Sequence, residues 1–315
     1  MSATRTEGPD GSLPSPALAT EWRRRPERGS RTLIGLMAAL SLRLGRPFGR
    51  LLLHGIGAYY FLFAPRAARH MRAYLRRALG RAPRGRDRMR LIMSFASTIH
   101  DRLYWLSGRQ ELFDVTVAGE DMIRAAIAGG GAFLMGAHVG SFEVLRTVGR
   151  RKSGFEVAMA MYEDNARKLN AILAAAAVRD PPEIIAVGRL DSMLRIRERL
   201  EQGMLVGVLA DRLFGDEPSV SVPFLGATAR LPVNPMRVAA VLRRRVIFML
   251  GLYRGGNRYH VVFEPLADFS STAPHERAAA IEAAITRYAA LLECHCRRDP
   301  YNWFNFFDFW GGAPR

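Results

Sequence analysis

The sequence predicts an α/β fold, with a mixed, largely parallel sheet flanked by helices and an N-terminal basic amphipathic helical segment. From about residue 113 onward, strand-like and helix-like runs alternate along the chain. The strand-like runs at 132–136 and 204–210 are apolar throughout, which is typical of strands that are buried on both faces. With 315 residues and 49% hydrophobic content, the chain is long enough to bury a large core.

The expected elements follow in order. Helical spacing of apolar side chains predicts a helix over 91–106. We then expect strands over 113–117, 132–136, 155–161, 184–187 and 204–210, separated by helices over 121–127, 143–150, 166–178 and 190–201. A loop over 215–232 leads to a helix over 235–243, paired strands over 246–253 and 259–264, a long helix over 275–297 and an aromatic end over 301–310.

Charge divides the chain into three parts. Residues 1–20 are rich in Pro, Ser, Gly and Thr and lack the apolar core of a signal peptide, so they are expected to form a flexible tail. Residues 21–90 carry 18 arginines and three acids, a net +15 out of the +17 of the whole chain. Residues 91–315 then form the expected catalytic domain.

The basic segment also contains apolar runs at 33–42 and 51–65, with Arg43, Arg46 and Arg50 between them. Both runs are shorter than the ~20 apolar residues that usually span a bilayer. Apolar runs edged by arginines predict helices that lie in a membrane interface, where arginines attract anionic headgroups. The alternative is a helix pair packed on the catalytic core with solvated arginines. No nucleic-acid-binding motif accompanies the charge, so nucleic acid is not the expected partner.

The segment around His138 has the strongest chemical pattern in the chain. His138 and Glu143 have four residues between them, at the junction between a strand-like run and a helix-like run. A histidine there can act as a general base, and a carboxylate on the next turn can orient the ring and stabilise the imidazolium. Ser141 is expected to cap the helix, although it also flanks the site. Gly136 and Gly140 would let a substrate approach the backbone, where amides at the helix start could hold an oxyanion.

Further polar residues follow other strands. Asp211 and Arg212 end the 204–210 strand, and Arg212 could bind a phosphate or carboxylate while Asp211 orients it. A surface ion pair is the alternative for these two residues. Asn165 and Arg179 flank the helix expected over 166–178 and are further candidates for substrate binding. Because sites in α/β folds gather at the carboxyl ends of strands, His138 and Asp211 are both well placed.

Several common enzyme classes lack their motifs here. The sequence has no phosphate-binding Walker loop, no G-x-G-x-x-G, no G-x-S-x-G nucleophile elbow and no H-E-x-x-H zinc motif. Its two cysteines, Cys294 and Cys296, make a poor metal clamp and no disulfide framework, which fits a reduced, cytoplasmic setting. We expect no metal and no tightly bound cofactor.

His138 and Glu143 match the H-x4-[D/E] motif of the lysophospholipid acyltransferase superfamily, and the wider pattern resembles its lipid A late acyltransferase branch, with related predicted glycolipid acyltransferases. The matching features run in family order from about residue 21 to 310. They are Trp22-Arg23, 27–30, 60–62, 136–146, Asn165, Arg179, 209–212, 222–224, Ala229, Pro232 and 301–304.

This resemblance implies transfer of an acyl chain from acyl carrier protein or coenzyme A to a hydroxyl, or an amine, of a membrane lipid or glycolipid. It implies His138 as the base, Glu143 as its partner, and a place at the cytoplasmic face of the bacterial inner membrane, peripheral or monotopic. The short apolar runs and the residues after Trp303 depart from the late lipid A enzymes and favour another acceptor. The alternatives are a thioesterase and a non-catalytic lipid-binding protein with the same fold.

Overall fold

A central strand, β2 (Ala132–Gly136), organises a sheet of seven strands in the order β1-β9-β8-β2-β5-β3-β4. The computed structural model describes residues 40–149, 155–162, 183–187, 190–214 and 216–311. The other strands are β1 (Asp114–Ala118), β3 (Val157–Tyr162), β4 (Ile184–Val187), β5 (Leu205–Leu209), β8 (Arg245–Tyr253) and β9 (Arg258–Asp268). All neighbouring strands of this sheet run parallel except β8 and β9, so the expected mixed, largely parallel α/β sheet is confirmed.

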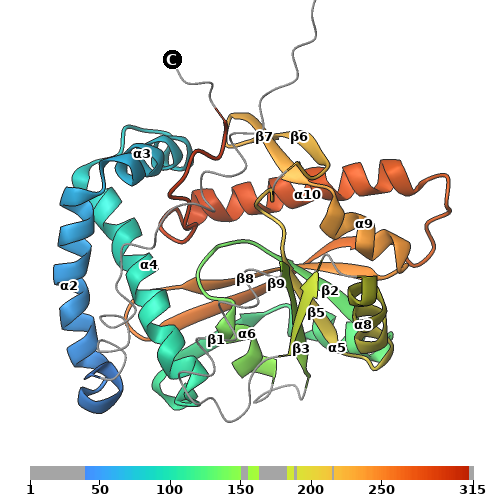
Figure 1. Cartoon of the computed structure of the whole chain (residues 1–315), viewed down its shortest axis with the longest axis horizontal. Helices are drawn as coiled ribbons and strands as arrows, with labels where there is room; N and C mark the ends of the chain where they lie inside the picture. The colour runs from blue at the N-terminus through green and yellow to red at the C-terminus, as the bar shows by residue number, and fades with distance from the viewer. Residues whose placement is uncertain (1–39, 150–154, 163–182, 188–189, 215, 312–315) are drawn as a thin grey trace, which may run out of the picture.

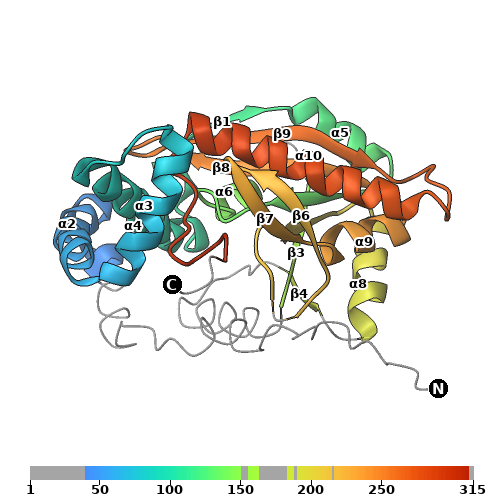
Figure 2. The same cartoon turned by 90° about the horizontal axis from the view of Figure 1, so that it is seen from above.

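Helices cover both faces of the sheet (Figures 1 and 2). The alternating side chains of β2 show the two layers, because Phe133 and Met135 join one core and Leu134 joins the other. The first core includes α3 (Pro65–Leu79), α9 (Asn234–Val241) and α10 (Arg277–Arg298). The second includes the end of α4 (Gly85–Leu106), together with α5 (Glu120–Ala128) and α6 (Glu143–Val148). A further helix in the described part of the chain, α8 (Leu190–Glu201), packs beside β4 and β5.

The basic segment forms helices. The helix α2 (Arg46–Phe63) begins with a proline in its first turn and ends at Ala64, directly before Pro65 opens α3. Gly80 closes α3 in the left-handed conformation that favours glycine at this position. In both views α2 lies at the outer edge of the molecule, beside α4 (Figures 1 and 2). No helix in the described ranges combines the length and apolar composition that a bilayer crossing needs.

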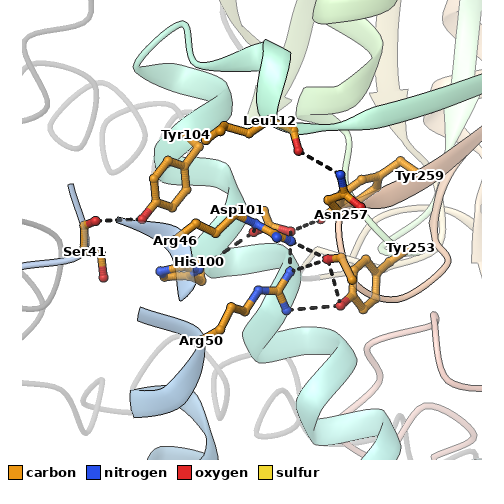
Figure 3. A network of polar contacts seen from close by, with 11 residues as sticks. Ser41, Arg46, Arg50, His100, Asp101, Tyr104, Leu112, Tyr253, Asn257 and Tyr259 are labelled. Atoms are coloured by element: carbon orange, nitrogen blue, oxygen red, sulfur yellow. Dashed lines mark hydrogen bonds and ion pairs between the residues drawn. The ribbon is translucent and has the colours of Figure 1, made fainter. Parts of the chain in front are cut away.

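A buried carboxylate, Asp101 of α4, holds α2 against the sheet (Figure 3). Its oxygens accept hydrogen bonds from Arg46 at 2.8 Å, from Arg50 at 2.6 Å and from the Tyr259 hydroxyl at 2.8 Å. Both guanidinium groups also donate to the carbonyl of Gly256, in the turn between β8 and β9. Charge-assisted bonds of this kind are stronger than neutral ones, and here they join three elements that are far apart in sequence.

The expectation that Arg46 and Arg50 attract anionic headgroups is corrected by this network. Arg46 and Arg50 are mostly buried, with side chains only 15% and 18% exposed, so they face Asp101 and not a membrane. Arg43 is exposed. The expected boundary between the basic segment and the catalytic domain, at residue 90, falls inside the continuous helix α4.

Most of the expected elements are found within one to three residues of their predicted bounds, but one expectation was wrong. The expected loop over 215–232 contains a hairpin of β6 (Ser219–Phe224) and β7 (Ala227–Pro232), which packs against α10. Pro223 and Pro232 lie within these strands, because a two-stranded sheet consists of edge strands, where proline is tolerated. The expected helix over 166–178 lies outside the described residues, as does most of the apolar run at 33–42.

We expect Asp101→Asn to lower the free energy of unfolding by about 2 to 4 kcal/mol, because it leaves two mostly buried guanidinium groups without their counter-ion. Urea unfolding at neutral pH measures the change. The same substitution at the exposed Asp121 is the matched control and should cost no more than about 0.5 kcal/mol.

The pH dependence of the stability lost in Asp101→Asn tests the role of this carboxylate a second time. Burial by itself raises the pKa of Asp101, but the neighbouring His100 ring, the hydrogen bond from Arg46 and the charge of Arg50 together hold that pKa below its ordinary value. A lowered folded-state pKa adds stability above the unfolded-state pKa, and this stability is lost as the pH falls through the folded-state pKa. The difference in the free energy of unfolding between the parent and Asp101→Asn should therefore become smaller in acid. A difference that became larger in acid would contradict the role given to Asp101.

Candidate active site

The register of the sheet brings His138 and Asp211 together. Gly136 at the end of β2 pairs with Leu209 at the end of β5, so the residues two positions beyond each strand end are neighbours. The ring Nδ1 of His138 lies 2.7 Å from Oδ1 of Asp211, and the His138 backbone amide donates to Oδ2 at 3.1 Å. The predicted strand-end histidine therefore has a carboxylate partner, although the partner is not Glu143.

The carboxylate of Asp211 is fully enclosed and has one further donor. The indole Nε1 of Trp303 donates to its Oδ2 at 2.9 Å, and Asp211 itself is 1% exposed. The C-terminal segment is held against the motif by its backbone as well, since Phe304 donates to the carbonyl of His138 and Gly140 donates to that of Asn302. The aromatic end of the chain is thus part of the site.

The electrostatics of the pair indicate which nitrogen is basic. Burial lowers the pKa of His138 below its ordinary value of 6.5, and the charge of Arg212 adds to this effect, while Asp211 opposes it. For Asp211, burial raises the pKa, but the contacts with His138, Arg212 and Trp303 outweigh burial and lower it. An ionised Asp211 accepts a hydrogen bond from the N–H at Nδ1 of a neutral ring. The Nε2 lone pair is then available to take a proton from a hydroxyl.

Glu143 has different partners from those expected. Its Oε2 accepts a hydrogen bond from the Ser141 hydroxyl at 3.0 Å, and its Oε1 lies 2.5 Å from Nε of Arg102 in α4. Ser141, expected to cap the helix, is buried and bonded to this carboxylate. Two carboxylates therefore lie near the motif: Asp211, brought by the β2–β5 register, contacts the ring, and Glu143, brought by the H-x4-E spacing, pairs with Arg102.

Both glycines of the motif lie against neighbouring groups and not against an open approach to the backbone, and the constraint is strict only at Gly140. A Cβ on Gly136 would lie 3.2 Å from Met249 and Leu209, and its carbonyl already accepts bonds from Tyr288 and from the backbone of Ala210. Gly140 has a φ of +60°, and a Cβ there would overlap the carbonyl of Gly251.

The amides of Gly140 and Ser141 are also occupied, by the carbonyls of Asn302 and Gly251. These two amides cannot serve the oxyanion site that was expected at the start of the helix.

Arg212 lies beside the pair with its side chain mostly buried. One guanidinium nitrogen donates to the carbonyl of Phe304 at 3.1 Å, and the group lies 5.1 Å from the ring centre of Phe307. Its Nε makes no hydrogen bond to the described residues, and burial lowers its pKa. The expectation of an anion-binding arginine fits this geometry. Asn165 and Arg179, the other expected binding residues, lie outside the described part of the chain.

His138, Glu143 and Arg212 line one cavity of about 540 Å³. Its walls are largely apolar and come from α4, β3, β5, α9 and the C-terminal segment. Representative apolar lining residues are Phe95, Ile99, Phe142, Met159, Val208 and Phe306. A histidine whose Nε2 has no hydrogen bond to the described residues, a cationic side chain and an apolar cavity together suit a long apolar substrate that carries a polar reactive group.

Sequence reasoning missed the contributions of Trp303 and Arg102 and assigned Asp211 to Arg212 instead of to His138. The strand-end position of Asp211 was visible in the sequence. That β2 and β5 are neighbours was not visible, because β3 and β4 come between them in the chain. For Arg102, no local signal links the middle of a long helix to the motif.

Comparison with known proteins agrees with these features. The family model of the bacterial lipid A biosynthesis acyltransferases matches residues 23–310, which include every described residue of the site. No curated protein matches the sequence.

NMR titration of the His138 ring tests the assignment of its partner. We expect the ring to titrate below pH 6.5, with the neutral form protonated at Nδ1. Asp211→Asn should lower the pKa further, because the group that raises it is lost, and should shift the tautomer equilibrium. Glu143→Gln should change the pKa and the tautomer equilibrium of His138 much less. A larger effect of Glu143→Gln than of Asp211→Asn would instead indicate that Glu143 orients the ring.

Proposed function

The chain belongs to the bacterial lipid A biosynthesis acyltransferase family, and on this premise we propose that it moves an acyl chain from a thioester of acyl carrier protein or coenzyme A to a hydroxyl, or an amine, of a membrane lipid or glycolipid. The family makes the protein an acyltransferase that acts on lipid A-like lipids. The observation that carries the finer proposal is the His138–Asp211 pair, because His138 lines a largely apolar cavity while the enclosed Asp211 holds its ring.

In the proposed reaction, Nε2 of His138 takes the proton of the acceptor hydroxyl as its oxygen attacks the thioester carbonyl. A new C–O bond forms, the C–S bond breaks, and the proton passes from His138 to the departing thiolate. Asp211 keeps the ring in the required tautomer and stabilises the imidazolium while it carries the proton. No acyl-enzyme is needed, because the acceptor attacks the donor directly.

Other residues of the cavity bind and position the substrates in this proposal. The apolar walls accommodate the acyl chain, and Arg212 attracts a phosphate or another anionic group of a substrate. Glu143 holds Arg102 at the wall formed by α4 and so shapes the polar end of the cavity. We place the enzyme at the cytoplasmic face of the bacterial inner membrane, as a peripheral or monotopic protein.

A labelled acyl thioester, incubated with the purified protein with and without membrane lipid, tests the reaction. Labelled lipid supports the proposal. Labelled free acid that forms at the same rate without lipid would make the protein a thioesterase. Thioester that remains intact under both conditions, with a folded protein, would favour a non-catalytic lipid-binding protein.

In this assay we expect His138→Ala to abolish transfer, since the base is lost. Asp211→Asn should lower kcat by about 10²- to 10⁴-fold, the usual range for general-base catalysis. Glu143→Gln should cost less than Asp211→Asn, because Glu143 does not contact the ring. His275→Ala, at an exposed histidine, is the control and should keep parental activity. Circular dichroism confirms that each variant is folded.

We also expect transfer to continue in the presence of a chelator, because a thioester is already activated and the proposed steps use side chains alone. The assay is repeated after dialysis against EDTA, with and without added zinc or magnesium. Activity lost on dialysis and restored by one metal would contradict the proposed mechanism.

A further inference from the structure

The outward face of α2 is apolar and exposed. Leucine, isoleucine and tyrosine side chains on this face are between 36% and 68% exposed, although side chains of this kind are usually buried in a water-soluble protein. Their spacing follows the helix, so they form one stripe, which we call the α2 stripe; it consists of Leu51, Leu52, Ile56, Tyr59 and Leu62.

The inward face of α2 is held in place by packing, so the helix cannot rotate to bury the α2 stripe. Gly49, Leu53 and Gly57 are buried on that face, and a Cβ on Gly57 would overlap the sulfur of Met93 in α4. The bonds from Arg46 and Arg50 to Asp101 hold the same face (Figure 3). Rotation of α2 would break these contacts, so the fold itself keeps the α2 stripe exposed.

The helix that follows supplies positive charge. Between Glu27 and Asp87 the sequence contains no acid, and Asp87 is buried and paired with Arg81. Four arginines of α3 are exposed, beginning three residues after the end of α2; they are Arg66, Arg69, Arg72 and Arg76. An apolar stripe next to a basic, acid-free helix is complementary to a bilayer surface with anionic headgroups.

We propose that α2 and α3 dock the enzyme on an anionic lipid surface, with the α2 stripe inserted at the level of the headgroups and the arginines of α3 on the phosphates. A second copy of the chain fits this surface poorly, because it would place one acid-free, arginine-rich segment against another. An acidic carrier protein would match the arginines but would leave the α2 stripe in water.

The docked orientation has a consequence for the site. Ile99 of α4 lines the cavity and is also 47% exposed, so the cavity reaches the surface on the helix that α2 packs against. A lipid leaving the bilayer beside α2 would meet this opening. The inference deepens the proposed function and rests on it for the identity of the substrate, but docking itself requires no catalysis.

Vesicle co-sedimentation of the full-length protein, without donor or acceptor, tests the docking. The probes are vesicles of phosphatidylcholine alone and of phosphatidylcholine mixed with phosphatidylglycerol. We expect Leu52→Gln/Ile56→Gln to weaken binding to both kinds of vesicle by about tenfold or more, because apolar insertion is lost. Leu194→Gln, at an exposed leucine of α8, is the matched control and should bind as the parent does.

The contribution of the α3 arginines can be measured separately in the same vesicle assay. Arg69→Gln/Arg72→Gln should weaken binding to the anionic vesicles by about fivefold per arginine and should leave binding to neutral vesicles nearly unchanged. Arg124→Gln/Arg237→Gln, on α5 and α9, is the charge-matched control and should behave as the parent. High salt should reduce the difference between the two vesicle types.

A fluorescence measurement places the stripe directly. In Ile56→Trp, added tryptophan emission should be quenched by vesicles of brominated lipid, while in Leu194→Trp it should not. Unquenched emission, or parental vesicle binding by the Leu52→Gln/Ile56→Gln variant, would overturn the proposal. A parent dimer that this variant converts to a monomer, with vesicle binding unchanged, would instead make the face a self-association surface. Failure of acyl transfer alone would leave the docking result standing.

Discussion

The buried carboxylate of Asp211 is the point on which the site depends. It receives hydrogen bonds from the ring and the amide of His138 and from the indole of Trp303, so it joins the ends of β2 and β5 to the C-terminal segment. An ionised carboxylate with so little solvent is stable only when donors surround it. The same donors that stabilise the charge therefore fix the ring of the base in one orientation.

A second buried carboxylate, that of Asp101, is also stabilised by surrounding donors, and its role is structural. Asp101 is the counter-ion that Arg46 and Arg50 share, and it lowers the cost of burying their charges. The adjacent residue Arg102 points to the other side of α4 and reaches Glu143 at the cavity wall. One turn of α4 thus carries both the residue that positions α2 and the residue that reaches the polar end of the cavity.

The H-x4-E pattern predicted Glu143 as the partner of His138, but in the structure the ring contacts Asp211. Its spacing places Glu143 in the first turn of α6, where it bonds Ser141 and Arg102. The acid that contacts the ring comes from a strand 73 residues away in the chain. A short motif constrains which side chains are near one another along a strand-turn-helix unit, whereas the partner across the sheet depends on strand order.

The sequence by itself determined the α/β class, the bounds of most strands and helices, the basic character of the N-terminal segment and the strand-end position of His138, because periodicity, charge and strand-end position are local properties. Tertiary structure alone decided that Asp211 and Trp303 hold the histidine, that Arg46 and Arg50 face inward, and that 219–232 pairs as a hairpin. These outcomes depend on which strands become neighbours and which face of a helix packs inward. Both are settled by contacts between distant residues, which no local pattern contains.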